Sequence, residues 1–120
     1  MLKRLLVAAF AAIIMLPALA HAESQTWQVR SFHPKVVDVA FYSESRKAEW
    51  PGGGKVYTIT NYNVQTYKLS CIAGEKVCYG AWVRNNDKRY WGRGHGGKQA
   101  CTNCCFTCDG GKTPVMNLNE

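Results

Sequence analysis

Six cysteines are the residues of this sequence best suited to chemistry, and four of them fall within eight positions. They are Cys71, Cys78, Cys101, Cys104, Cys105 and Cys108. Sulfur in such a pattern can form structural disulfides, bind a thiophilic metal ion, or exchange electrons with other thiols. An even number of cysteines in a short exported chain favours a disulfide framework. We therefore expect three disulfides, for which fifteen pairings exist.

Two disulfide arrangements remain open for Cys71 and Cys78, the cysteines outside the segment 101–108. Around a turn at Gly74-Glu75, Cys71 and Cys78 would face each other across a β-hairpin, within the reach of a disulfide. Alternatively, each clamps its strand to the segment 101–108, which closes larger loops and restricts the unfolded chain more. The neighbours Cys104 and Cys105 are expected to bond to different partners, because a disulfide between adjacent residues is strained.

The dense segment also allows metal binding or redox catalysis. A tetrahedral zinc set would combine three cysteines with a fourth ligand: Cys101, Cys104 and Cys108 with Cys105 or His95. Residues 101–104 and 105–108 are both formal Cys-x-x-Cys pairs, but redox catalysis needs a βαβ framework that the sequence does not predict. Structural disulfides are therefore preferred, and we predict no bound metal or cofactor.

The first 22 residues have the pattern of a cleaved secretory signal peptide. Lys3 and Arg4 precede the apolar run 5–20, and Ala20-His21-Ala22 places small residues where signal peptidase requires them. We predict cleavage after Ala22, with Ala20 as the alternative. Residues 5–22 also approach the length of a membrane anchor, although Pro17 favours cleavage. The domains are thus a signal peptide, 1–22, and one β domain, 23–120, in the bacterial periplasm or secreted.

The charge of the predicted mature chain is modestly basic. Cleavage leaves 13 lysines and arginines against eight acidic residues, a net charge of +5. These basic residues are scattered from Arg30 to Lys112, whereas nucleic-acid binding needs a basic patch or stripe. We therefore expect no nucleic-acid partner and no stable membrane insertion after cleavage.

Alternating apolar residues separated by turn residues predict short strands along the mature chain. We expect strands at 26–32, 35–43, 55–61, 64–71 and 113–118, with a Gly- and Cys-rich loop before the last. Aromatic residues at alternating positions are expected in the core: Trp27, Phe41, Tyr57, Tyr67 and Tyr79. The fold class is all-β: a small antiparallel sandwich or partly open barrel of six or seven strands, with a disulfide-stapled C-terminal loop.

Two hairpins are predicted in the second half of the mature chain. The first turns at Gly74-Glu75 and pairs Cys71 with Cys78. The second turns at Asn86-Asp87, and counting outward pairs Trp82 with Trp91. Opposed aromatic and β-branched residues would stabilise this hairpin by about 0.2–1 kcal/mol per pair.

A cluster of aromatic and basic residues around the second hairpin is the candidate binding site. Its members are Trp82, Tyr90, Trp91, Arg84, Arg89, Arg93 and His95. Flat aromatic rings beside guanidinium groups suit a sugar or a protein partner. The competing interpretation is a tryptophan pair that covers the core, with His95 in a flexible glycine-rich loop. No nucleophile, base and orienting group assemble in the sequence, so we expect no enzyme and no catalytic residues.

The stretch from Cys71 to Trp82, CIAGEKVCYGAW, is followed by Tyr90-Trp91-Gly92 and the CxxCCxxC segment. Together they resemble small exported cysteine-rich bacterial proteins over roughly residues 36–111. No activity is attached to those proteins, so no functional residue carries over to this chain.

These observations lead to the hypothesis of an exported, non-catalytic binding module. Its partner would be a protein, as for an inhibitor or immunity protein, or an envelope glycan. A thiol–disulfide or metal-binding protein using the segment 101–108 is the first alternative. A cationic membrane-active factor is the second.

Overall fold

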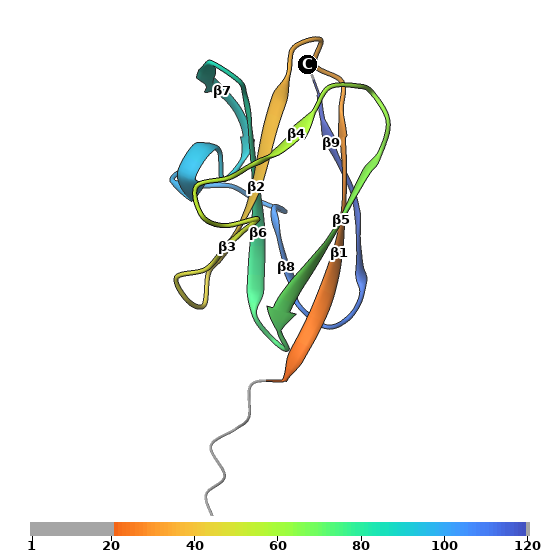
Figure 1. Cartoon of the computed structure of the whole chain (residues 1–120), viewed down its shortest axis with the longest axis vertical. Helices are drawn as coiled ribbons and strands as arrows, with labels where there is room; N and C mark the ends of the chain where they lie inside the picture. Colours follow the sequence, from red (N-terminus) through yellow and green to blue (C-terminus); the bar gives the residue numbers. More distant parts are fainter. Residues whose placement is uncertain (1–20, 120) are drawn as a thin grey trace, which may run out of the picture.

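The computed structural model describes residues 21–119, which fold into two β-sheets packed face to face (Figure 1). The all-β sandwich predicted from the alternation is confirmed, and its sheets are not closed into a barrel. Within residues 21–119 the only helical element is the short 3-10 turn η1 (His95–Gly97). The predicted signal peptide lies outside the described residues except for His21 and Ala22.

The smaller sheet has three strands in the order β5-β1-β9. Their bounds are β1 Ala22–Ser31, β5 Gln65–Ile72 and β9 Lys112–Leu118. The central strand β1 runs antiparallel to β5 and parallel to β9. Strands from both ends of the described chain therefore lie side by side in this sheet (Figure 1).

The larger sheet is built around one long antiparallel pair, β2 (Val37–Ser43) and β6 (Lys76–Val83). Further strands flank this pair on each side. On the β2 side these are β3 Glu49–Trp50 and β4 Tyr57–Ile59, and on the β6 side β7 Asn86–Gly92 and β8 Cys105–Thr107. The structure has nine strands in residues 21–119, so the prediction of six or seven is too low. Strands β3, β4 and β8 have only two or three residues, which is too short to show alternation.

Aromatic rings fill the core between the sheets. Trp27 and Phe41 are fully buried, with ring centroids 5.0 Å apart, and Tyr79 lies 6.0 Å from Trp27. Tyr57 and Tyr67 are half-buried against this cluster, so the five predicted core aromatics are confirmed. The indole Nε1 of Trp27 donates to the side chain of Gln25 at 2.7 Å.

The predicted hairpin around Gly74-Glu75 is wrong. The turn exists, with the Glu75 amide donating to the Ile72 carbonyl at 2.9 Å, but its flanking strands β5 and β6 belong to different sheets. Strand β6 is buried almost throughout and instead pairs with β2 from Val77 to Val83. Cys71 and Cys78 therefore do not face each other as hairpin partners.

The second hairpin exists, but its predicted register is wrong. Its turn residues are Arg84 and Asn85, and Asn85 takes the left-handed conformation at φ 66° that asparagine tolerates. A register irregularity between Trp82 and Val83 then places Trp82 opposite Tyr90. Trp91 lies opposite Ala81 rather than Trp82.

Three disulfides link the cysteines: Cys71–Cys108, Cys78–Cys105 and Cys101–Cys104. The first two clamp strands β5 and β6 to the C-terminal segment, which is the long-range arrangement left open by the sequence. Adjacent Cys104 and Cys105 bond to different partners, as predicted. Several disulfides in a small domain fit an extracellular location. No helix in residues 21–119 is long and apolar enough to cross a membrane.

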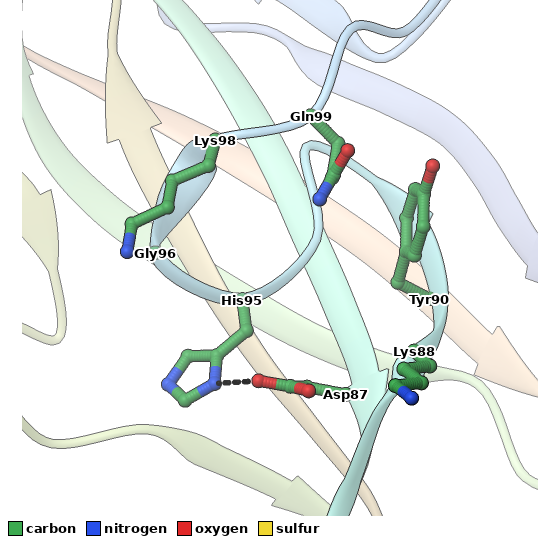
Figure 2. A pocket seen from close by; sticks show the side chains of 7 residues that line it. All are labelled: Asp87, Lys88, Tyr90, His95, Gly96, Lys98 and Gln99. Carbon is green, nitrogen blue, oxygen red and sulfur yellow. Dashed lines mark hydrogen bonds and ion pairs between the residues drawn. The ribbon is translucent and has the colours of Figure 1, made fainter.

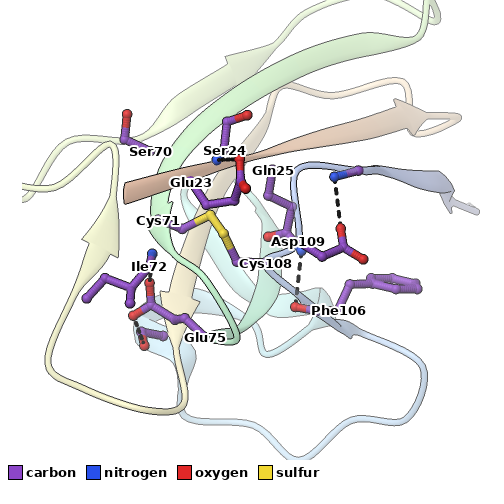
Figure 3. Close-up of a disulfide and its surroundings, with 12 residues drawn as sticks. Glu23, Ser24, Gln25, Ser70, Cys71, Ile72, Glu75, Phe106, Cys108 and Asp109 are labelled. Carbon is purple, nitrogen blue, oxygen red and sulfur yellow. Dashed lines mark hydrogen bonds between the residues drawn. A yellow bond between two sulfur atoms is a disulfide. The ribbon is translucent and has the colours of Figure 1, made fainter. Parts of the chain in front are cut away.

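The buried carboxylate of Glu75 stabilises the connection between β5 and β6, which lie in different sheets, beside the Cys71–Cys108 disulfide (Figure 3). Glu75 accepts hydrogen bonds from the guanidinium of Arg46, from the Ser43 hydroxyl at 2.7 Å and from the Ile72 amide at 3.1 Å. Burial alone would raise the pKa of Glu75, but these donors outweigh it and hold the pKa below its ordinary value near 4.5.

The stability of the domain is expected to fall in acid because of Glu75. Since its folded pKa lies below its unfolded value, the stabilisation is complete above about pH 4.5 and is lost as the pH falls through the folded pKa. Urea unfolding between pH 7 and pH 3 measures this effect. Glu75→Gln should be less stable at pH 7 and show a shallower acid slope than the wild type. A slope unchanged by the substitution would contradict the assignment.

Candidate ligand-binding site

The loop 93–99 lies on the outer face of the larger sheet because one glycine leaves room for it. A Cβ atom at Gly80 would run into the carbonyl oxygen of Gly94 and lie 2.9 Å from the Tyr42 ring. Gly94 itself has φ 62° and ψ −165°, a region almost restricted to glycine. The loop is held by a hydrogen bond from the Arg93 amide to the Tyr79 carbonyl at 2.8 Å.

Tyr42 supports the loop from the neighbouring strand β2. Its hydroxyl accepts a hydrogen bond from the Gly96 amide at 3.0 Å. Burial raises the pKa of Tyr42, an effect that the Gly96 amide partly offsets. The phenol is therefore neutral at physiological pH and serves as a fixed polar support.

His95 is oriented by contacts on two sides. Its ring stacks on Trp82 with centroids 4.3 Å apart and planes inclined by 12°. Its Nδ1 lies 3.1 Å from Oδ2 of Asp87. Trp82 is only 4% exposed, and the imidazole ring of His95 covers its indole ring. The position of the histidine ring is thus set by both packing and hydrogen bonding.

A cavity of about 510 Å³ lies beside this histidine, between β7 and the loop (Figure 2). It is lined by Asp87, Lys88, Tyr90, His95, Gly96, Lys98 and Gln99. Tyr90 offers an aromatic surface that is 37% exposed, and both its ring and the side chain of Gln99 lie beside Gly94. The volume falls within the range of small-molecule sites.

The charges around the cavity favour an anionic group. Lys88 and Lys98 supply two ammonium groups, while Asp87 supplies one carboxylate that already contacts His95. The lining therefore carries a positive formal charge even when His95 is neutral. Its side chains combine charge, an aromatic face and amide hydrogen bonding in a single cavity.

The predicted aromatic and basic cluster divides into separate parts in the structure. Trp82, Tyr90 and His95 come together on the outer face. Trp91 lies on the opposite face, packed against the core, where its Nε1 donates to the Asn119 carbonyl at 2.9 Å. Arg89 stacks on the Trp91 ring with its Cζ 4.5 Å from the centroid.

The other two predicted arginines are held in ion pairs. Arg84 lies 2.8 Å from Asp38, and Arg93 lies 2.6 Å from Glu44. Arg84 and Arg89 line a second cavity, of about 700 Å³, together with His33. The seven predicted residues therefore form no continuous surface, and those at the first cavity are Tyr90 and His95, with Trp82 beneath.

Sequence reasoning missed four of the side chains that line the first cavity: Asp87, Lys88, Lys98 and Gln99. Lys88 could have been predicted from the sequence. Residues two apart on a strand share a face, and this places Lys88 beside Tyr90. Lys98 and Gln99 follow the glycine-rich stretch 92–97. The sequence does not show that this stretch folds back beside β7, so their place at the cavity could not be predicted.

The proposed zinc set is not assembled as free thiols, because all six cysteines are in disulfides. Cys108 pairs with Cys71, away from the predicted set. A different group comes together instead, with the sulfur atoms of Cys78, Cys104 and Cys105 within 4.8 Å of one another. Comparisons of the chain with protein-family models, curated proteins and solved structures gave no match.

Proposed function

We propose that this chain is a non-catalytic binding module of the bacterial periplasm or exterior, and that its ligand is an envelope glycan carrying carboxylate or phosphate groups. The observation that carries the proposal is the cavity beside η1, which is lined by an exposed tyrosine ring, two lysines and an oriented histidine. Export is supported by the signal-like first 22 residues and by the three disulfides.

The side chains of the cavity match the groups of an acidic sugar. A sugar ring has apolar C–H faces that pack on an aromatic surface, which Tyr90 provides. Its hydroxyl groups would hydrogen-bond with Gln99 and the carboxylate of Asp87. Its carboxylate or phosphate would be attracted by Lys88 and Lys98. A neutral sugar would lack this attraction.

A binding role is better supported than a catalytic one. The cavity lining contains no serine, threonine or cysteine that His95 could activate as a nucleophile. One face of the imidazole is stacked on Trp82, and its Nδ1 already contacts Asp87. These contacts fix the ring as part of the wall of the site.

Replacing Tyr90 should weaken binding to an acidic glycan. We expect Tyr90→Ala to lower the affinity of the oxidised chain for a uronic-acid oligosaccharide about tenfold, because truncating a central aromatic contact costs more than about 1 kcal/mol. Isothermal titration calorimetry measures the change. A neutral oligosaccharide of the same length should bind more weakly to the wild type.

Tyr62→Ala is the matched control, because Tyr62 is 53% exposed and does not line the cavity. It should bind the uronic-acid probe as tightly as the wild type. If Tyr90→Ala bound like the wild type, or if Tyr62→Ala lost as much affinity, the cavity would not be the glycan site. Capture of one envelope protein at this cavity, with no glycan binding, would instead favour the protein-partner hypothesis.

A further inference from the structure

Two of the three disulfides place four sulfur atoms in one small cluster. Cys78 on β6 is the register partner of Cys105 on β8, with their Cα atoms 3.9 Å apart. Cys105 Sγ lies 3.5 Å from Cys104 Sγ, which is bonded to Cys101. The sulfur atoms of Cys78, Cys104 and Cys105 all lie within 4.8 Å of one another, and those of Cys78 and Cys105 are bonded.

The non-bonded separation of Cys104 and Cys105 is close to that between two sulfur ligands of a tetrahedral thiolate site. Zinc–sulfur bonds of about 2.3 Å place neighbouring ligand sulfurs about 3.8 Å apart. The 3.5 Å contact between Cys104 and Cys105 already matches this spacing. Only the two bonded pairs would have to open, and each belongs to a disulfide that reduction cleaves.

We propose that reduction of Cys78–Cys105 and Cys101–Cys104 creates a binding site for one zinc-like d10 ion, ligated by Cys78, Cys101, Cys104 and Cys105. This set differs from the one expected from the sequence, because Cys78 of β6 takes the place of Cys108. The inference is independent of the proposed glycan binding, which uses the oxidised chain and other residues.

The chemistry requires an external dithiol as the reductant. Each protein disulfide accepts two electrons and two protons, and each dithiol loses two of both to become a disulfide. Two dithiols therefore convert the two protein disulfides into four thiols. On binding the divalent ion, the thiols release their protons to solvent and four metal–sulfur bonds form.

Accessibility favours reduction of these two disulfides before the third. Cys101 and Cys105 are half-buried, so each of the two bonds has one sulfur-bearing residue that a reductant can approach. In Cys71–Cys108 both residues are buried, at 4% and 0% exposure. The remaining disulfide would continue to hold the C-terminal segment against β5.

Backbone hydrogen bonds would keep the four thiols together after reduction. The Tyr79 amide donates to the Cys104 carbonyl at 3.0 Å, which fixes the loop to β6. The Cys108 amide donates to the Glu75 carbonyl at 2.7 Å, and the Gly74 amide to the Cys108 carbonyl at 2.8 Å. These bonds do not depend on the two disulfides that open.

The test uses the exported chain, reduced by limiting dithiothreitol without oxygen, desalted, and titrated with Cd²⁺. Alkylation mapping should show Cys71–Cys108 intact. Native mass spectrometry should show one Cd²⁺ per chain, with a thiolate-to-cadmium absorption band. Cys101→Ala/Cys104→Ala removes two ligands and should bind Cd²⁺ roughly a hundredfold more weakly.

Thr102→Ala is the matched control, because it changes an exposed residue of the same loop but keeps all four ligands and the Cys71–Cys108 disulfide. Its Cd²⁺ affinity should remain within about threefold of that of the reduced wild type. The proposal is overturned if the reduced chain binds no more Cd²⁺ than the oxidised chain, or if Cys101→Ala/Cys104→Ala binds like the wild type. Glycan binding by the oxidised chain is a separate measurement, so either proposal can fail alone.

Discussion

Replacing Cys71 and Cys108 together with alanine is expected to lower the free energy of unfolding by about 4 kcal/mol. The disulfide joins residues 37 positions apart, and its loss frees a long loop in the unfolded chain. Alanine is chosen because a serine hydroxyl at these buried positions would lack a partner. Urea or guanidinium unfolding of the oxidised variant measures the loss. Since the free energy of unfolding of a protein is typically about 5–15 kcal/mol, the variant would be only marginally stable at 37 °C.

The comparison is Cys101→Ala/Cys104→Ala, which also deletes two sulfur atoms. Its disulfide spans a separation of only three residues, so the same relation gives a loss of about 2 kcal/mol. We expect the long-range pair to cost clearly more than the short-range pair. Equal losses would mean that local packing of the sulfur atoms, and not restriction of the unfolded chain, determines the contribution of each bond.

Gly80→Ala is expected to displace the loop 93–99, which borders the cavity beside η1. The added methyl group would overlap the Gly94 carbonyl oxygen, which is backbone and cannot rotate away as a side chain can. We expect the free energy of unfolding to fall by about 2–3 kcal/mol, which is at the upper end of the cost of overpacking. We also expect the affinity for the uronic-acid probe to fall more than tenfold. Chemical denaturation and calorimetry measure the two effects.

Gly111→Ala is the control for Gly80→Ala. Neither glycine has a positive φ, but the nearest atom to a Cβ at Gly111 belongs to the side chain of Asp109, which can move. We expect near wild-type glycan affinity and a smaller stability loss. If Gly80→Ala kept full affinity, the cavity would not depend on the contact between β6 and the loop.

The strands were predictable from local sequence, whereas their partners were not. Alternation around Trp27 and Phe41 marks strands because side chains on a strand alternate between two faces. The same pattern does not say which sheet a strand joins, so the turn at Gly74 was interpreted as a hairpin although it connects two sheets. Pairings between distant residues, such as Glu23 with Cys71, leave no local signal.

The candidate site was predictable to a similar extent. Tyr90 and His95 were identified because an aromatic strand residue and a glycine-rich loop are visible in the sequence. The decisive detail for Trp91 is the register irregularity between Trp82 and Val83, because it leaves three residues, 87–89, without a partner on β6 and this odd number turns the Trp91 ring to the core face. Asp87 was missed because its contact with His95 exists only after the loop folds back.

The placement of β1 between β5 and β9 has a consequence for how an exported chain of this kind would acquire its fold. If the chain is exported N-terminus first, as we propose, β1 would emerge early and its parallel neighbour β9 much later. The small sheet cannot be completed while the chain is still threading through the membrane. Such long-range closure is slow to nucleate, so the polypeptide would remain open and compatible with a secretion channel until almost all of it has crossed.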